Sequence, residues 1–184
     1  MSDRDVYAVP LAQKLGYVNT HYHKSPRLDI TNIDNGQVGQ YDFLISTDVF
    51  EHVTPPVSRA FNNARKLLKP SGVFIFSVPY TTGGGETREH FPDLNDFKIV
   101  KRSNRYELEN TTTSGEVQRF TNLTFHGGKG STLEIRLFSL ESLHREFQVA
   151  GFNEIKIYEQ PCLQYGIFWG DECWSLPMST RVVV

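Results

Sequence analysis

Two carboxylates and an imidazole stand close together in the stretch TDVFEHV, at Asp48, Glu51 and His52. An imidazole whose pKa is near ~6.5 can take up or release a proton at neutral pH, which suits general acid–base chemistry. The same three side chains could instead ligate a cation, but no supporting carboxylate stands at a recognisable spacing, so no metal is assigned. A third interpretation is a local ion pair of Glu51 with His52 that braces the start of a helix.

The elements around this stretch have a strand–helix–strand pattern. Residues 41–47 (YDFLIST) form a short apolar run that predicts a buried strand. A helix is then expected, with Thr54 as its cap, Pro55 in its first position and apolar residues at spacings of three and four. The turn KPSG ends it, and residues 73–78 (VFIFSV) are apolar almost throughout, which is typical of a strand covered on both faces of a parallel sheet. The acidic stretch therefore lies at the carboxyl end of a strand, where such sheets bind ligands.

Further elements are expected on both sides of this unit. Residues 5–15 have helical spacing, Ser139 can cap a helix that ends at Gly151, and a strand pattern follows it. The expected strands in the second half are at residues 152–158 and 179–184, and the arms of an expected hairpin are residues 116–125 and 132–138. We predict one domain over residues 1–184, an α/β fold with a doubly wound, mostly parallel sheet, and a polar insertion at about residues 81–138.

Composition limits the class of protein. The chain has 184 residues, 39% of them hydrophobic, and a formal net charge of −2, which argues against a dedicated nucleic-acid binder. A basic cluster at residues 98–105 is flanked by acids and is interpreted as a solvated surface. No apolar run approaches the ~20 residues that span a bilayer, no basic and apolar leader is present, and Cys162 and Cys173 lack a metal-binding spacing. We predict a cytoplasmic protein with no nucleic-acid or membrane partner.

Three segments, in this order, resemble the second half of the class I S-adenosylmethionine-dependent methyltransferases. The first, YDFLISTDVFEHV, resembles the family's fourth strand and the DVLEHV-like loop that follows it. The second, LLKPSGVFIFSVP, resembles the LKPGG turn and the fifth strand. The third, SLHREFQVAGFNEIKIY, resembles the L..AGF helix and the sixth strand. Phe50 replaces the usual leucine, and Ser71 replaces the first glycine of the turn. The resemblance implies a Rossmann-like methyltransferase fold, S-adenosylmethionine as cofactor, and methyl transfer to a small polar acceptor.

The resemblance also implies roles for individual residues. The expected cofactor-binding residues, from the adenine end to the floor of the site, are Asp29, Ile30, Ser46, Thr47, Asp48 and Phe50. His52, with Glu51, is the expected catalytic pair where the acceptor must lose a proton. The insertion is expected to bind the acceptor through Tyr80, Arg88, His90 and His126. Two alternatives stay open: Asp29 caps a turn, and the polar residues of the insertion tie down a long loop.

One part of the family pattern is not found in this sequence. The family begins with a strand and a glycine-rich loop that cradles the cofactor, and the two later glycine clusters, GGG and HGGKG, do not replace that loop. The expectation is an amino-terminally shortened domain whose exposed sheet edge pairs with another copy, giving a homo-oligomer. The alternative function is a non-catalytic methyltransferase-like domain that acts in assembly or regulation.

Overall fold

The main sheet has four strands. The computed structural model describes residues 5–103, 105–128, 130–165, 168 and 178–181. The strand order is β1 (Tyr41–Thr47), β2 (Leu68–Ser77), β12 (Met178–Arg181), β11 (Glu154–Ile157). β1 and β2 are parallel, whereas β12 is antiparallel to both of its neighbours. The sheet is therefore mixed and not mostly parallel as predicted, because the last strand follows β11 in the chain and returns beside it in the opposite direction.

β1 forms one edge of this sheet in the part of the chain that the structure describes. Pairing of two copies through this edge stays a prediction, as does the division of the chain into one domain. The predicted strand at residues 179–184 is confirmed for residues 179–181, and residues 182–184, like Cys173, lie outside the described residues.

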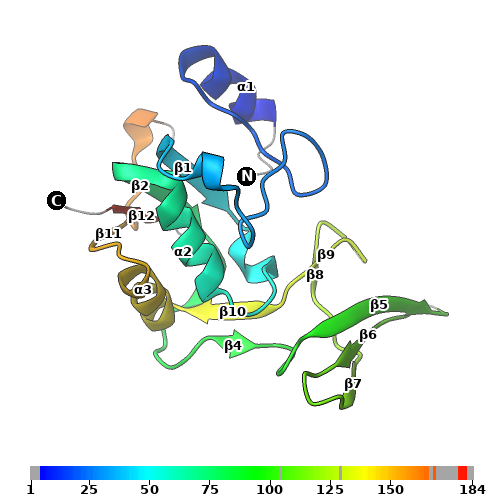
Figure 1. Ribbon diagram of the computed structural model, residues 1–184. Helices are drawn as coiled ribbons and strands as arrows, with labels where there is room; N and C mark the ends of the chain where they lie inside the picture. Colours follow the sequence, from blue (N-terminus) through cyan, green and yellow to red (C-terminus); the bar gives the residue numbers. More distant parts are fainter. Residues whose placement is uncertain (1–4, 104, 129, 166–167, 169–177, 182–184) are drawn as a thin grey trace.

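Two helices pack on one face of the sheet, α2 (Ser58–Leu67) and α3 (Leu140–Val149) (Figure 1). Phe61 of α2 and Phe147 of α3 meet Phe74 and Phe76 of β2 in a fully buried aromatic cluster. Ile75 points to the other face and is 37% exposed. The apolar run predicted that both faces of β2 would be covered, and the face with Ile75 is covered less than the other. Burial of the aromatic rings stabilises this face through the large apolar area that each ring removes from water.

The helix ends depend on local chemistry. The Ser139 side chain accepts a hydrogen bond from the Ser142 amide at 3.0 Å, and Gly151 ends the helix at φ +91°, both as predicted. α2 begins at Ser58, four residues after the predicted cap Thr54. The reason is that Pro55, the predicted first helical residue, precedes Pro56, and a residue before a proline is disfavoured in the helical region.

Four further helices lie in the described part of the chain. They are α1 (Asp5–Lys14) and the three single-turn helices η1 (Asn35–Gln37), η2 (Phe50–His52) and η3 (Leu163–Tyr165). α1 confirms the predicted amino-terminal helix. Among the described residues no helix has the length and apolar character needed to cross a bilayer.

The insertion folds differently from the single hairpin that we predicted. β10 (Arg136–Ser139) lies between β3 (Tyr80–Thr81) and β4 (Arg88–Glu89). β5 (Asp96–Arg102), β6 (Arg105–Thr111) and β7 (Val117–Phe120) form an antiparallel sheet, and β8 (Phe125–His126) pairs with β9 (Thr132–Leu133). The predicted hairpin is confirmed where Phe125 pairs with Leu133. It was wrong for residues 117–120, which pair with β6 instead.

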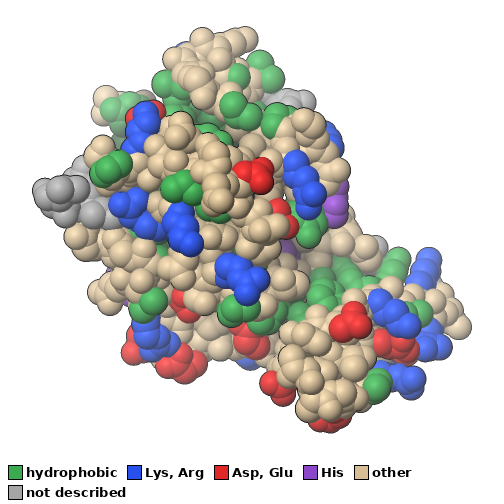
Figure 2. Space-filling model, in the orientation of Figure 1, with side chains coloured by type: hydrophobic (Ala, Val, Ile, Leu, Met, Phe, Trp, Pro, Cys, Tyr) green, Lys and Arg blue, Asp and Glu red, His purple; other side chains and the backbone are tan. Residues whose placement is uncertain are grey.

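Charges of both signs cover the sheet β5–β6–β7, at the lower right of Figures 1 and 2. Lys98 lies 3.2 Å from Glu109, and Arg102 lies 3.1 Å from Glu107 and 2.7 Å from Glu109. These ion pairs hold the pKa of Glu109 below its ordinary value, chiefly through the hydrogen bond from Arg102. The basic cluster is thus balanced by acids on neighbouring strands, as expected for a solvated surface.

We expect Phe74→Ala to lower the free energy of unfolding by about 3–5 kcal/mol, because it empties part of the aromatic core. Ile75→Ala, on the next residue of β2, is the matched control and should cost clearly less, because that side chain is 37% exposed. Urea unfolding followed by circular dichroism measures both. Equal losses would contradict the assignment of the core to this face.

Candidate functional site

The predicted acidic stretch forms a tight turn at the end of β1. Asp48 has φ +50°, its amide donates to the Ser77 carbonyl oxygen at 2.8 Å, and the Ser77 hydroxyl donates to its carboxylate at 3.4 Å. η2 follows and sends the Phe50 ring into the aromatic core, 4.9 Å from the Phe61 ring. Phe50 is fully buried there, which leaves it no surface for the cofactor contact that we predicted. Its role is to anchor the turn.

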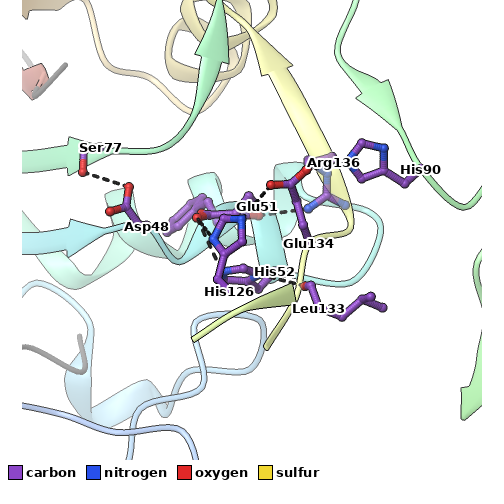
Figure 3. Close-up of polar contacts among 10 residues, drawn as sticks. Asp48, Glu51, His52, Ser77, His90, His126, Leu133, Glu134 and Arg136 are labelled. Carbon is purple, nitrogen blue, oxygen red and sulfur yellow. Dashed lines mark hydrogen bonds and ion pairs between the residues drawn. The ribbon is translucent and has the colours of Figure 1, made fainter. Parts of the chain in front are cut away.

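Residues 133–135 of the insertion are hydrogen-bonded to η2. The amide of Ile135 donates to the Glu51 carbonyl oxygen at 2.8 Å, and Nδ1 of His52 donates to the Leu133 carbonyl oxygen at 2.7 Å. Figure 3 shows this segment crossing the turn beside Glu51 and His52. The two candidate catalytic residues are therefore positioned by the insertion as well as by β1.

The guanidinium of Arg136 reinforces this contact from inside the molecule. Its side chain is fully buried; Nη1 donates to the carbonyl oxygens of Phe50 and Val53 at 2.9 and 2.5 Å, and Nε donates to Glu89 at 2.7 Å. Nη2 makes no hydrogen bond. The Glu89 side chain is 36% exposed, whereas the guanidinium is fully buried. Removing this buried donor would leave two carbonyl oxygens of the turn without a partner, so Arg136 holds η2, β10 and β4 together.

The Glu51 side chain faces two imidazoles. Its side chain is 0% exposed, and Oε1 lies 3.4 Å from Nε2 of His52 and 3.7 Å from Nδ1 of His126. The two rings are 4.9 Å apart in an edge-to-face arrangement. Burial raises the pKa of Glu51 to about 8, and burial lowers the pKa of His52 below its ordinary value. One ligand atom from each of Glu51, His52 and His126 lies within 4.8 Å of the others, so this group could hold a metal ion.

A second carboxylate supports one of these imidazoles. Glu134 accepts a hydrogen bond from Nε2 of His126 through Oε2 and from Nε2 of His90 through Oε1, each at 2.7 Å. Both carboxylate oxygens are thus occupied. The arrangement fixes the ring of His126, whose other nitrogen is directed at Glu51.

A cleft of about 920 Å³ opens beside this cluster. It is lined by residues 20–23 and 28–31, by the turn that follows β1 with His52 of η2, and by residues of the β8–β9 hairpin of the insertion. Five of the residues predicted for function line it: Asp29, Ile30, Asp48, His52 and His126. Sequence-distant segments therefore meet in one space of the size that takes a small ligand.

Asp29 already performs the alternative role that we considered. Its Oδ1 accepts hydrogen bonds from the Thr31 amide at 3.0 Å and from the Thr31 hydroxyl at 2.7 Å, so it caps a turn. Arg27 lies 3.9 Å from Oδ2. The cap does not exclude a ligand, because an ionised carboxylate has about four acceptor positions.

Other predicted residues lie away from the cleft. Ser46 is buried in β1 and Thr47 is half-buried at the end of that strand, while Tyr80 and Arg88 lie in β3 and β4, Arg88 exposed. His90 does not line the cleft; it holds Glu134 by the hydrogen bond described above. For His90 the loop-bracing alternative describes the observed contact, because the β4–β10 pairing directs its ring to Glu134.

Sequence reasoning missed Glu134 and Arg136. They stand two residues apart in TLEIRLF, among apolar residues on both sides, and were interpreted as part of a hairpin arm. Opposite charges at alternate positions of an apolar strand indicate side chains that share one face. That signal could have marked them as partners of buried groups.

A family model described as "Methyltransferase domain" matches residues 4–157 of this chain. The chain belongs to this methyltransferase family. The family that the DVFEHV, LKPSG and AGF segments resembled is therefore confirmed. Membership of this family implies a Rossmann-like methyltransferase fold, and the sheet with helices packed on it agrees with that fold class.

Several solved methyltransferase structures are similar to this methyltransferase chain. One is the 1,6-didemethyltoxoflavin-N1-methyltransferase of Burkholderia thailandensis with bound 1,6-didemethyltoxoflavin and S-adenosylhomocysteine, at 16% identity and a TM-score of 0.46, covering 96% of this chain and 56% of that one. A second is an S-adenosylmethionine-dependent methyltransferase of Clostridium acetobutylicum, at 11% identity and a TM-score of 0.44, covering 86% and 64%. The CcbJ methyltransferase of Streptomyces caelestis has 15% identity and a TM-score of 0.42, covering 86% and 63%.

This chain spans between 56% and 64% of the length of those three proteins. No curated protein sequence matches it.

We expect Arg136→Met to lower the free energy of unfolding by about 3–5 kcal/mol. Methionine keeps much of the side-chain volume but leaves the carbonyl oxygens of Phe50 and Val53 and the Glu89 carboxylate without their donor. Arg102→Met is the matched control, because Arg102 is half-exposed in ion pairs at the surface, which contribute little to stability. Urea unfolding measures both, and a small loss for Arg136→Met would show that the guanidinium does not hold the turn.

Proposed function

We propose that this chain binds S-adenosylmethionine in the cleft and transfers its methyl group to a small polar acceptor. The observation that carries the proposal is the meeting of Asp29, Asp48 and His126 around one space, although they come from three distant segments. Membership of the methyltransferase family supports the same activity. The neighbour from Burkholderia thailandensis, with S-adenosylhomocysteine bound, is consistent with this cofactor.

The residues of the cleft fit such a cofactor. A volume of about 920 Å³ lies within the ~300–1,000 Å³ common for small-molecule sites. Asp29 would accept a hydrogen bond from the adenine amino group through acceptor positions that the Thr31 turn does not use, and Ile30 would offer apolar surface to the ring. Asp48, at the end of β1, would lie beside the rest of the cofactor. The cofactor supplies, when bound, a methyl group activated by a sulfonium.

The opposite wall of the cleft would receive the acceptor. It carries polar side chains of the insertion, namely His126, Ser131 and Thr132, next to the apolar Leu133. Hydroxyl and imidazole groups can donate or accept hydrogen bonds, which suits a small acceptor with polar groups. His126 is the predicted substrate-binding residue on this wall, but its Nε2 donates to Glu134 and its Nδ1 faces Glu51, so its proposed contact with the acceptor is through the face of the ring. The hydroxyls of Ser131 and Thr132 are the proposed hydrogen-bonding groups, and Arg88 and His90 are not proposed for this contact.

Methyl transfer requires little covalent chemistry from the protein. Bound S-adenosylmethionine would give its methyl group to the acceptor and would leave with the electron pair of the broken carbon–sulfur bond as a neutral thioether, so the leaving group needs no proton from the protein. Holding the two reactants in line supplies much of the rate, up to ~7–11 kcal/mol in good cases. An acceptor that carries a proton must also lose it, and we propose that the cluster of Glu51, His52 and His126 takes part in that step.

Calorimetric titration with S-adenosylmethionine and S-adenosylhomocysteine tests the proposal. We expect Asp29→Asn to weaken binding about tenfold, because asparagine can keep the turn hydrogen bonds but replaces one acceptor oxygen by a donor. Asp42→Asn is the matched control: Asp42 is exposed on β1, pairs with Lys69 and does not line this cleft, so binding should not change.

Failure of the folded chain to bind either compound would overturn the cofactor assignment. It would favour the non-catalytic role in assembly or regulation. Equal weakening by Asp29→Asn and Asp42→Asn would show that Asp29 has no specific contact with the ligand.

A further inference from the structure

The tautomer of His52 follows from its backbone partner. Nδ1 lies 2.7 Å from the Leu133 carbonyl oxygen, which can only accept a hydrogen bond. Nδ1 therefore carries the hydrogen, and in the neutral ring Nε2 carries a lone pair. That nitrogen is directed at Oε1 of Glu51, 3.4 Å away.

His126 is held in the complementary way. Its Nε2 donates to Oε2 of Glu134 at 2.7 Å, and the other oxygen of Glu134 is occupied by His90. In the neutral ring Nδ1 of His126 therefore carries the lone pair. It too is directed at Oε1 of Glu51, at 3.7 Å (Figure 3).

Three electron-pair donors thus converge with no hydrogen bond among them. The two distances to Oε1 exceed the ~2.7–3.2 Å of an N–H···O hydrogen bond. Neither oxygen of the fully buried Glu51 side chain has a hydrogen-bond partner. Burial of an unpaired carboxylate against two lone pairs is unfavourable unless a proton or a metal cation lies between them.

We propose that Glu51, His52 and His126 bind one divalent transition-metal cation of the zinc type. Zinc forms bonds of ~2.0–2.1 Å to imidazole nitrogen and carboxylate oxygen in tetrahedral sites, which places neighbouring ligand atoms ~3.3 Å apart. The 3.4 and 3.7 Å separations from Oε1 of Glu51 to the two imidazoles are within a few tenths of an ångström of this value. The ligand nitrogens of His52 and His126 lie within 4.8 Å of each other, and binding of a cation would draw them closer. Imidazole ligands favour a transition metal over magnesium or calcium, which prefer oxygen.

The surroundings of the cluster have the features of a metal site. Metal-bound imidazoles usually donate their other N–H to a carboxylate or a backbone carbonyl, which fixes the ring and its tautomer. Glu134 does this for His126, and the Leu133 carbonyl does it for His52. His90 in turn holds Glu134, which gives this residue, first predicted to bind substrate, a positioning role.

Three protein ligands leave one position of a tetrahedral site for water or substrate. His52 and His126 both line the cleft, so that position would be reached from the cleft. A hydroxyl bound there would lose its proton more readily, because the cation stabilises the resulting anion. This last step rests on the proposed methyl transfer, whereas binding of the cation does not.

The alternative occupant of the cluster is a proton on Glu51. Glu51→Gln separates the two, because the neutral amide resembles a protonated carboxyl in size and hydrogen-bonding capacity but is a poor zinc ligand. A folded Gln variant that no longer binds metal is therefore expected from the proposal. His23→Ala is the matched control, because His23 lines the same cleft but lies outside the cluster.

The experiment is a titration of the chelator-stripped full chain with Zn²⁺, by calorimetry and by metal analysis after dialysis. We expect one equivalent per chain, bound on the order of micromolar or tighter. Glu51→Gln and His126→Ala should weaken binding more than about tenfold, Glu134→Gln about 10–100-fold, and His23→Ala not at all. Co²⁺ in place of Zn²⁺ should give the visible absorption bands of a four-coordinate site, lost in Glu51→Gln.

Two results would overturn the proposal. One is the absence of stoichiometric Zn²⁺ binding by wild-type chain that circular dichroism shows to be folded. The other is binding that persists undiminished in folded Glu51→Gln, which would place the metal elsewhere. Neither result depends on S-adenosylmethionine, so failure of the proposed methyl transfer would leave this test intact.

Discussion

The buried guanidinium of Arg136 is the constraint on which the site depends. A charge without solvent must be matched by acceptors, and here the acceptors are two carbonyl oxygens of the turn around η2 and the Glu89 carboxylate. Satisfying one side chain therefore brings β4, β10 and η2 to a single place. The hydrogen bonds from the Ile135 amide to the Glu51 carbonyl oxygen and from Nδ1 of His52 to the Leu133 carbonyl oxygen lie along the same contact.

Two glutamates in this small region illustrate how environment decides chemistry. Glu134 has both oxygens hydrogen-bonded to imidazoles and acts as a support. Glu51, a few ångströms from His126, has no hydrogen-bond partner for either oxygen, and burial raises its pKa to about 8. A carboxyl group thus makes two hydrogen bonds in one position and none in the other, because N–H groups are directed only at Glu134.

The site is shared between the family core and the insertion. The core provides a rigid platform: the Phe50 ring sits among the aromatic side chains of α2 and β2, so the turn that follows β1 cannot shift easily. The insertion contributes His126 and the residues that hold it. In the proposed site, the core would therefore set where a ligand binds, and His126 of the insertion would lie against that ligand.

The sequence by itself determined what depends on near neighbours in the chain. The bounds of β1, the Ser139 cap, the Gly151 stop and the family membership all follow from local period, capping chemistry and short motifs. The later start of α2 could also have been predicted locally, since Pro55 precedes Pro56 and is disfavoured as the first helical residue. These features need no knowledge of what lies on the other side of the molecule.

Only the tertiary structure decided which of the polar residues meet. The spacing of apolar residues along the sequence does not predict that His126 faces His52 or that His90 donates to Glu134. Nor does it predict that Phe50 points into the core. Those contacts depend on the register of β8–β9 and β10 across the turn, and a shift of one residue would reverse every side chain on a strand. Pairing between distant segments is set by how the whole chain satisfies its buried groups, and this is why the elements were predictable and the cluster was not.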